Sequence, residues 1–439
     1  MKTGGRLQAA IEVLTDVETR RRPVADALKD WGLSHRFAGS GDRVAIGSLA
    51  IDALRKKASL AHLMADPSPR AAVLATFAIL WGQGTEALEA ALADPHAPKP
   101  LSKAERARLV ADPVAALADA PDHVRADVPE WLAASLRAVW GEAFETEGTA
   151  LAARAPVDLR VNTLKGSREE ALAALAHMNP ATTPLSPVGL RLPETAPTAK
   201  PPHVPSEAAY QSGLIEIQDE GSQLAALVAA PEPGARILDL CAGGGGKSLA
   251  LAAAQGNSGR IFAYDTDKRR FGDFRDRAAR AGATCVELRP PLGADDPLAD
   301  LEGTIDLVFV DAPCSGTGTW RRRPDAKWRL RPNALAARQK DQDVVLDRAA
   351  DLAGPNARIV YVTCSVLPEE NEERVAAFLL RHDDWRLADP LARLDPVLAE
   401  KLAPFAASRL GLAPCLRLSP ASADTDGFFA AALERGTPK

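Results

Sequence analysis

The sequence has 439 residues, enough for two or three domains, and its 46% apolar and 25% charged residues are ordinary for a soluble globular protein. Its longest apolar run, residues 71–81, is too short to cross a bilayer, and the first residues lack the apolar segment of a signal peptide. We therefore expect a cytoplasmic protein without membrane contact. None of the five cysteines forms a C-x-x-C pair, so no metal site is expected.

The charges of the chain are unevenly distributed. A net charge of -5 is not typical of a nucleic-acid binder. However, residues 1–70 contain twelve Lys and Arg against eight Asp and Glu, and residues 313–345 contain eight against three. For the first stretch, a solvated surface and a binding surface are equally good explanations. The second stretch adjoins the candidate site described below, which favours binding there.

The first part of the chain, residues 1–125, is predicted to form a helical domain. Leu7, Ile11 and Leu14 share one helix face. Ser68, before Pro69, and Ser102 are typical helix N-cap residues. The histidines of this part are scattered singly and are most simply structural, so the domain suits binding rather than catalysis.

The remainder of the chain is predicted to form two further parts. A short strand near residues 159–162 and a Pro-rich passage predict a small α+β connector over residues 126–225. From residue 226 to 439, strands and helices alternate, which is typical of βαβ units and a parallel sheet. The strands are expected at 235–241, 259–264, 283–287, 304–311 and 357–363, the helices near 247–256, 267–281, 333–353 and 368–380, and a closing β-hairpin within 412–433.

A glycine-rich loop follows the first of these strands and leads into a helix; its residues are Cys241, Ala242, Gly243, Gly244, Gly245, Gly246 and Lys247. Glycines let a ligand approach the backbone, and the helix amino terminus adds donors. A nucleoside triphosphate loop would need glycine where Cys241 stands. Asp265, at the end of the second strand, is placed to bind ribose hydroxyls. The pattern predicts a nucleoside cofactor, with NAD and S-adenosylmethionine both open.

Two further strands each deliver a cysteine at their carboxyl end, Cys314 and Cys364. Neighbouring parallel strands would bring both thiols to one crevice beside the cofactor. Hydride transfer has no need of two thiols, but a pyrimidine methyltransferase does. A thiolate that adds to carbon 6 makes carbon 5 nucleophilic, and a second group must then help to release the base. The alternative is a pair of buried structural cysteines, which the adjoining polar loops disfavour.

These motifs resemble those of the Sun/Nop family of RNA cytosine-5 methyltransferases, most closely its bacterial Fmu/RsmB branch. The matching stretches are LDLCAGGGGKS, AYDTDKRR, DAPCSGTGTWRRRPDAKW, YVTCSVLPEENEE, LRVNTL, IQDEGSQLAA and DGFF. The resemblance covers about residues 125–439, and the helical part resembles a NusB-like RNA-binding domain less strongly. It implies an α/β fold, with a Rossmann-like class I methyltransferase sheet (226–439), an α+β connector (126–225) and an all-helical NusB-like domain (1–125).

The resemblance also implies a role for each site residue. Cys364 would be the nucleophile, Cys314 would help to release the methylated base, and Asp311 would contact the base edge. S-adenosylmethionine would lie against the loop Cys241–Lys247, Asp265, Arg270 and Asp311, with a surface charge as the alternative for Arg270. Arg321, Arg322, Arg323 and Lys327 would meet RNA phosphates. Trp320 or Trp328 would stack on a base or, as the alternative, belong to the core.

Two departures from the family pattern affect the cofactor site. Gly243 and Gly244 stand where the family usually has Ala-Pro, and the stretch Glu287–Pro291 lacks the usual acid after strand three, which leaves the adenine contact open. We expect a monomeric, S-adenosylmethionine-dependent RNA cytosine-5 methyltransferase that acts on small-subunit ribosomal RNA. The alternatives are methylation of transfer RNA and a catalytically weak, RNA-binding ribosome-assembly factor.

Overall fold

The computed structural model describes residues 1–196, 199, 202–292, 295–408 and 411–436. The chain divides into two compact units. We call them the helical unit (Met1–Arg154, Thr195–Pro201 and Trp320–Leu330) and the sheet unit (Ala155–Glu194, Pro202–Thr319 and Arg331–Lys439). Among the described residues, no helix is long and apolar enough to span a membrane.

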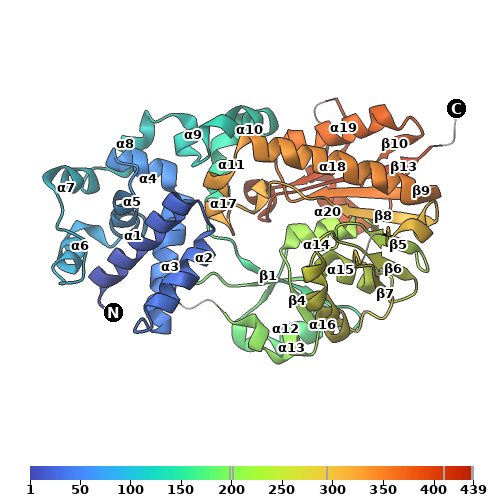
Figure 1. Cartoon of the computed structure of the whole chain (residues 1–439), viewed down its shortest axis with the longest axis horizontal. Coiled ribbons are helices and arrows are strands. Elements are labelled where there is room, and N and C mark those ends of the chain that lie inside the picture. The colour runs from blue at the N-terminus through green and yellow to red at the C-terminus, as the bar shows by residue number, and fades with distance from the viewer. Residues whose placement is uncertain (197–198, 200–201, 293–294, 409–410, 437–439) are drawn as a thin grey trace. The chain divides into compact units, whose positions relative to one another are not determined.

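The helical unit is built from helices around one apolar core (Figure 1). Its α-helices are α1 (Thr3–Arg20), α2 (Val24–Ser34), α3 (Ser40–Arg55), α4 (Lys57–Met64), α5 (Pro69–Ala75), α6 (Gly84–Leu92), α7 (Lys103–Leu109), α8 (Pro113–Ala118), α9 (Asp122–Arg125), α10 (Ala133–Trp140), α11 (Phe144–Leu151) and α17 (Pro324–Arg329). The predicted N-caps are confirmed, because Ser68 accepts a hydrogen bond from the amide of Ala71 and Ser102 from that of Glu105. Leu7 and Leu14 of α1 are buried against Ile46 of α3.

The helical unit extends beyond the boundary expected at residue 125. Helices α10 and α11 continue it to Arg154, and α17 comes from the part expected to belong to the sheet. Trp328 of α17 packs against the apolar core of this unit, and its indole nitrogen donates to the carbonyl oxygen of Leu54 at 2.6 Å. Non-local packing of this kind leaves no signal in the local sequence pattern, which explains the difference.

A small antiparallel sheet opens the sheet unit. It has the strand order β2 (Ala181–Thr182), β3 (Gly189–Leu192), β1 (Val157–Val161) and β4 (Ile215–Ile217). With α12 (Arg168–Ala174) and α13 (Ala208–Gln211) it forms a core of its own around Leu159, Leu190 and Ile215. This α+β part agrees in character with the expected connector, but it belongs to the same compact unit as the large sheet.

The large sheet has the order β11-β12-β13-β9-β8-β5-β6-β7, and β10 pairs with β13. Its strands are β5 (Arg236–Asp239), β6 (Arg260–Ala263), β7 (Val286–Leu288), β8 (Ile305–Asp311), β9 (Ala353–Thr363), β10 (Trp385–Ala388), β11 (Ala406–Ala407), β12 (Cys415–Leu418) and β13 (Phe428–Arg435). The pairs from β9 to β7 are parallel, and β13 and β12 join as antiparallel strands. The predicted strands and closing hairpin are confirmed within one to four residues.

Helices cover both faces of the large sheet (Figure 1). They are α14 (Glu220–Leu227), α15 (Gly246–Ala254), α16 (Phe271–Ala281), α18 (Pro332–Leu352), α19 (Glu372–Arg381), α20 (Pro396–Leu402) and α21 (Pro420–Ala423). Ile237 and Phe309 pack with α14, α15 and α16, whereas the alternate residues Leu238 and Val308 pack with α18 and α19. Burial of both faces explains the continuous apolar runs of these strands and leaves the carboxyl edge for polar side chains.

Candidate active site

The two predicted thiols lie together at the carboxyl edge of the large sheet. Strands β8 and β9 are parallel neighbours, and Asp311 is in register with Val362. The chain leaves both strands at the same level, so that the sulfur atoms of Cys314 and Cys364 are 3.3 Å apart. The proximity predicted from the sequence is confirmed.

The environment of Cys314 favours its protonated form. The pKa of this thiol is raised well above its ordinary value, first by its S–H···S interaction with Cys364, then by burial, and further by the charges of Cys364 and Glu370. Either sulfur can donate the S–H···S interaction, and the burial of Cys314 and the nearby charge of Glu370 add to the preference of this thiol for its proton.

A half-buried ion pair lies beside the thiols. The Nζ atom of Lys247 donates to the Oδ2 atom of Asp311 at 2.6 Å and lies 5.3 Å from the centre of the Phe428 ring. Burial alone lowers the pKa of Lys247, but the Asp311 charge and hydrogen bond outweigh it, with contributions from Cys364 and Asp239, so the pKa is raised. Lys247 is thus a firmly protonated cation next to Asp311.

The glycine loop between β5 and α15 lies tightly against its surroundings. Gly245 has a φ of +84°, and a Cβ at this position would be 2.4 Å from the Phe274 ring. Only glycine fits there. One turn earlier, the amide of Gly243 donates to the Oδ2 atom of Asp265 at 2.8 Å, and Arg270 approaches the same oxygen at 3.2 Å. The loop, Asp265 and Arg270 are therefore brought together as the sequence predicted.

Two arginines that the sequence did not single out, the buried Arg160 and the half-buried Arg277, hold this loop from behind. Arg160 of β1 donates to the carbonyl oxygen of Gly246 at 2.8 Å, and Arg277 of α16 donates to that of Gly244. Glu216 of β4 pairs with Arg277 at 3.0 Å. The only signal in the sequence was the match of the LRVNTL stretch, which contains Arg160. The small sheet thus fixes the shape of the loop.

These residues fit S-adenosylmethionine over part of its length. Asp265, only 6% exposed, has its carboxylate against the loop backbone, where a ribose needs acceptors. The α15 amino terminus and Lys247 are suited to an amino-acid carboxylate. After β7, however, Arg289 pairs with Glu287 at 2.7 Å and with Asp300 at 3.0 Å. A cation therefore occupies the position where an acid for the adenine was sought.

Asp239, at the end of β5, lies beneath this loop. It is fully buried, and burial raises its pKa to about 7, while the hydroxyl of Ser248 donates to it at 2.5 Å. Burial also raises the pKa of Cys241 well above the ordinary value. Cys241 therefore favours its protonated form, and it contributes backbone and bulk to the loop.

Two of the four cations predicted to meet RNA phosphates are buried. Arg321 is 3% and Lys327 1% exposed, and both belong to the helical unit. The Nζ atom of Lys327 donates to the carbonyl oxygen of Arg55 at 3.1 Å, and burial lowers its pKa to about 7. Neither side chain is available to a phosphate, so the structure contradicts the prediction for these two. Arg322 and Arg323 are exposed, and their phosphate contacts stay a prediction.

The two tryptophans of the same stretch belong to the core. Trp320 is 1% exposed, and Trp328 packs into the helical unit through its bond to Leu54. Lys327 lies 4.9 Å from the centre of the Trp328 ring and 5.9 Å from that of Trp320. The core role, and not stacking on a base, is the one that this packing supports.

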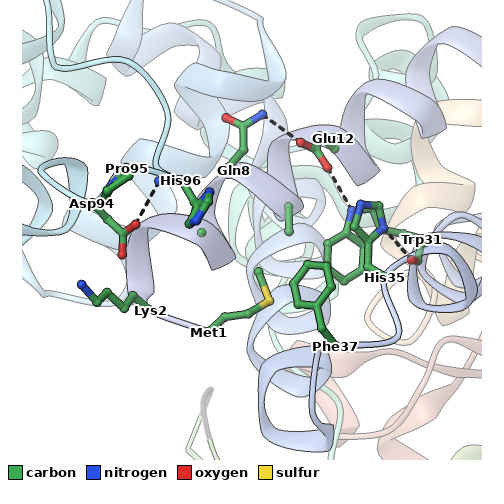
Figure 2. A pocket seen from close by; sticks show the side chains of 12 residues that line it. Met1, Lys2, Gln8, Glu12, Trp31, His35, Phe37, Asp94, Pro95 and His96 are labelled. Carbon is green, nitrogen blue, oxygen red and sulfur yellow. Dashed lines mark hydrogen bonds between the residues drawn. The ribbon is translucent and has the colours of Figure 1, made fainter.

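The helical unit contains a cavity of about 520 Å³ with different chemistry (Figure 2). The rings of Trp31 and His35 stack with centres 4.2 Å apart, and Phe37 meets His35 edge-on. Glu12 accepts a hydrogen bond from the indole of Trp31 at 3.0 Å. Gly5 of α1 also lines the cavity, and a Cβ at this position would lie 3.8 Å from that of His96. The cavity offers aromatic and polar surface, but its lining residues include no thiol.

A polar network around Glu370 and Asn371, both fully buried, lies behind the thiols. The sequence showed it only as an acidic run inside the matched YVTCSVLPEENEE stretch, where it was given no role. Its contacts are described below.

Comparisons with known proteins agree with this geometry. Residues 226–434 match the family model described as 16S rRNA methyltransferase RsmB/F, and residues 128–199 match its ferredoxin-like domain. Ribosomal RNA small subunit methyltransferase B of Klebsiella pneumoniae is 34% identical over 59% of this chain and 59% of its own length. The protein of the same name from Sodalis glossinidius is 33% identical over 74% of this chain and 69% of its own length. Considerable parts of both relatives thus lie outside the match.

A solved structure extends the likeness to the fold. The crystal structure of a methyltransferase homologue from Pyrococcus horikoshii is 26% identical, with a TM-score of 0.56, and covers 72% of this chain and 97% of that one. The likeness in fold therefore extends over nearly three quarters of this chain.

Proposed function

This chain belongs to the RsmB/F family of 16S rRNA methyltransferases, and from that premise we propose that it methylates carbon 5 of a cytosine in small-subunit ribosomal RNA. The observation that carries the proposal is the pair of thiols, 3.3 Å apart, beside the Lys247–Asp311 ion pair. Such a pair can supply one thiolate for attack on carbon 6 of a pyrimidine and a second group for the release of the base.

We assign the two roles from the motifs in which the thiols stand, Cys364 in Thr-Cys-Ser and Cys314 in Pro-Cys. In the proposed attack, the Cys364 thiolate forms a bond from its sulfur to carbon 6 of the cytosine. The electron pair of the C5–C6 double bond then becomes available at carbon 5, and Asp311 faces the base edge. Once Cys364 is bonded to carbon, its S–H···S interaction with Cys314 is lost, and this interaction is the largest cause that raises the Cys314 pKa. Cys314 then releases its proton to water and becomes a base.

The release step uses the thiolate so formed. Cys314 takes the proton from carbon 5, the C5–C6 double bond is restored, and the bond between carbon 6 and Cys364 breaks, which returns the Cys364 thiolate. When bound, S-adenosylmethionine supplies an electrophilic methyl group to carbon 5. The loop 241–247, Asp265 and Arg270 would hold or border that cofactor. The cytosine has to be unpaired or flipped out to reach both sulfurs.

The choice of RNA rests on the relatives, whose names specify the small ribosomal subunit. We propose that the protein acts as a monomer in the cytoplasm, and that the helical unit contributes to the recognition of the RNA. Transfer RNA is the alternative substrate. A second candidate function is that of a protein that binds RNA with weakened affinity for the cofactor. The observation that favours it is Arg289, which lies after β7 where an acid would contact the adenine.

Three proteins test the proposal: wild type, Cys314→Ala, and Cys314→Ala with Cys364→Ala. Each is incubated with S-adenosylmethionine and small-subunit ribosomal RNA and run on a denaturing gel. We expect methyl transfer by wild type and an RNA-linked band in the single variant alone, because it can attack but cannot release. A band in the double variant would contradict the role of Cys364. Parallel reactions with transfer RNA, and a calorimetric titration of the cofactor, distinguish the two alternatives.

A further inference from the structure

We propose that the consecutive residues Glu370 and Asn371 are positioning residues that set the separation of the two thiols, Glu370 for Cys314 and Asn371 for Cys364. The inference deepens the proposed function, since it concerns how the same site is held. It rests on hydrogen bonds to the residues immediately before and after each cysteine.

Glu370 holds the residue after Cys314 with both carboxylate oxygens. The amide of Ser315 donates to its Oε1 atom at 2.7 Å, and the hydroxyl of Ser315 donates to its Oε2 atom. Gln342 of α18 donates to the same Oε1 atom at 3.1 Å and also to the carbonyl oxygen of Pro313 at 2.9 Å. The residues on both sides of Cys314 are thereby bound to one buried carboxylate and its amide partner.

Asn371 does the same for Cys364. The hydroxyl of Thr363 donates to its Oδ1 atom at 2.5 Å, and its Nδ2 atom donates to the carbonyl oxygen of Ser365 at 2.9 Å. Both groups of the side-chain amide are used, one on each neighbour of the cysteine. Because asparagine presents one acceptor and one donor, aspartate could not reproduce this pattern.

The two holding residues are linked to each other and to the sheet. They share a peptide bond, and the hydroxyl of Tyr361 on β9 donates to the carbonyl oxygen of Glu370 at 2.6 Å. Glu370 and Asn371 are both fully buried, so these bonds are shielded from water. The amide of Gly318 also donates a hydrogen bond to the carbonyl oxygen of Cys364 at 3.0 Å, which links the loops that carry the two cysteines. One short segment therefore fixes both sulfur positions.

The arrangement predicts that the two residues affect different steps. Glu370→Gln keeps the size of the side chain but places an NH₂ or a weaker acceptor against the Ser315 donors, which loosens the Cys314 loop. Asn371→Ala removes both bonds around Cys364. A displacement of about 1 Å at a reacting group costs about 10²-fold. We expect Glu370→Gln to slow release and Asn371→Ala to slow attack.

The first experiment needs neither cofactor nor RNA. The free protein is treated with diamide, a two-electron thiol oxidant that takes up the two protons, and formation of the Cys314–Cys364 disulfide is followed by peptide mass mapping. Glu370→Gln and Asn371→Ala are each expected to slow it at least tenfold, because the sulfurs are no longer held together. Glu373→Gln is the matched control, since its carboxylate is 51% exposed and contacts Arg374 only at 3.9 Å.

The second experiment separates the steps on the RNA gel. Glu370→Gln with both cysteines present is expected to accumulate the RNA-linked band. Asn371→Ala, combined with Cys314→Ala, is expected to reduce the band at least tenfold relative to Cys314→Ala alone. Folding is checked by thermal melting, and where a variant fails to fold, Glu370→Asp or Asn371→Asp takes its place.

Oxidation of the folded variants at the wild-type rate, or equal effects of both residues on attack and release, would overturn the proposal. If wild type transfers no methyl group, the proposed function fails, whereas the oxidation rates still decide whether the two residues hold the thiols.

Discussion

The matched stretch from Asp311 to Trp328 is divided between the two units of the molecule, and its two parts have different roles. Up to Thr319 it belongs to the sheet unit and brings Asp311 and Cys314 to the reactive edge. From Trp320 to Leu330 it belongs to the helical unit, where its cations Arg321 and Lys327 are buried. Neighbours in a motif thus differ in role because they join different cores, and not because their chemistry differs.

The contrast is sharpest between two lysines, the half-buried Lys247 and the buried Lys327. Lys247 has a carboxylate partner, Asp311, and its pKa is raised. Lys327 donates to a carbonyl oxygen and lies near Arg55 and Lys56 as well as Asp127, so burial lowers its pKa to about 7. The first lysine is held as a cation at the site, whereas the second carries the cost of burying a charge.

Replacement by methionine should reduce the methyl-transfer activity strongly at Lys247 and hardly at all at Lys327. Lys247→Met leaves Asp311 without its cation, and we expect a loss of about 10²-fold in kcat, the usual effect of removing one charged donor from an active site. Lys327→Met should change kcat less than about twofold when compared at a temperature where both variants are folded. Single-turnover methyl transfer measures both. Equal losses would contradict the separate roles of the two lysines.

The free energy of unfolding, in contrast, should depend on Lys327, because this lysine is buried without a carboxylate that accepts its hydrogen bond. The folded chain releases the Lys327 proton near pH 7, whereas the unfolded chain keeps it until about pH 10.4. The unfolded state therefore binds more protons in this window, and this group makes wild-type stability rise from pH 7 to 10. Its cost is fully present below pH 7 and amounts to at most about 5 kcal/mol.

Lys327→Met is accordingly expected to raise the free energy of unfolding at pH 6.5 by roughly 2–4 kcal/mol, after the loss of one hydrogen bond. At pH 10 the difference should nearly vanish. Urea unfolding at pH 6.5, 8 and 10 measures this dependence. Parallel stability–pH curves for the two proteins would show that Lys327 is not the group responsible.

The smallest effect is expected at the exposed arginines. Arg322→Ala with Arg323→Ala should weaken RNA binding several-fold and reduce the salt dependence of log K by about one per lost phosphate contact. Arg321→Ala, at a buried position, should lower the melting temperature and leave the salt slope unchanged. Filter binding at several salt concentrations measures the slope. An unchanged slope in the double variant would remove the last two predicted phosphate contacts.

The sequence predicted the sheet edge well because its signals are local. Continuous apolar runs identified the buried strands, and the carboxyl-edge rule brought Cys314 and Cys364 together. Asp265 and the glycine loop followed from the same reasoning. The roles proposed for these residues still await the experiments above.

The parts that the sequence did not predict depend on distant contacts. Charged residues are rarely buried, so Arg321 and Lys327 were assigned to the surface. Their burial follows from the packing of α17 in a unit about 270 residues away in the chain, as the bond from Lys327 to Arg55 shows. The acidic run containing Glu370 was likewise indistinguishable from a solvated helix start.

The entry of α17 into the helical unit has a consequence for synthesis on the ribosome. Residues 1–154 are made first, yet the core that they form is complete only after Trp328 has left the exit tunnel. By then the whole of the chain from Ala155 to Thr319 has been made. The amino-terminal unit is thus finished late, and a fragment cut at Arg154 would expose the apolar surface that Trp328 covers. The gene cannot be divided between these units at a single point.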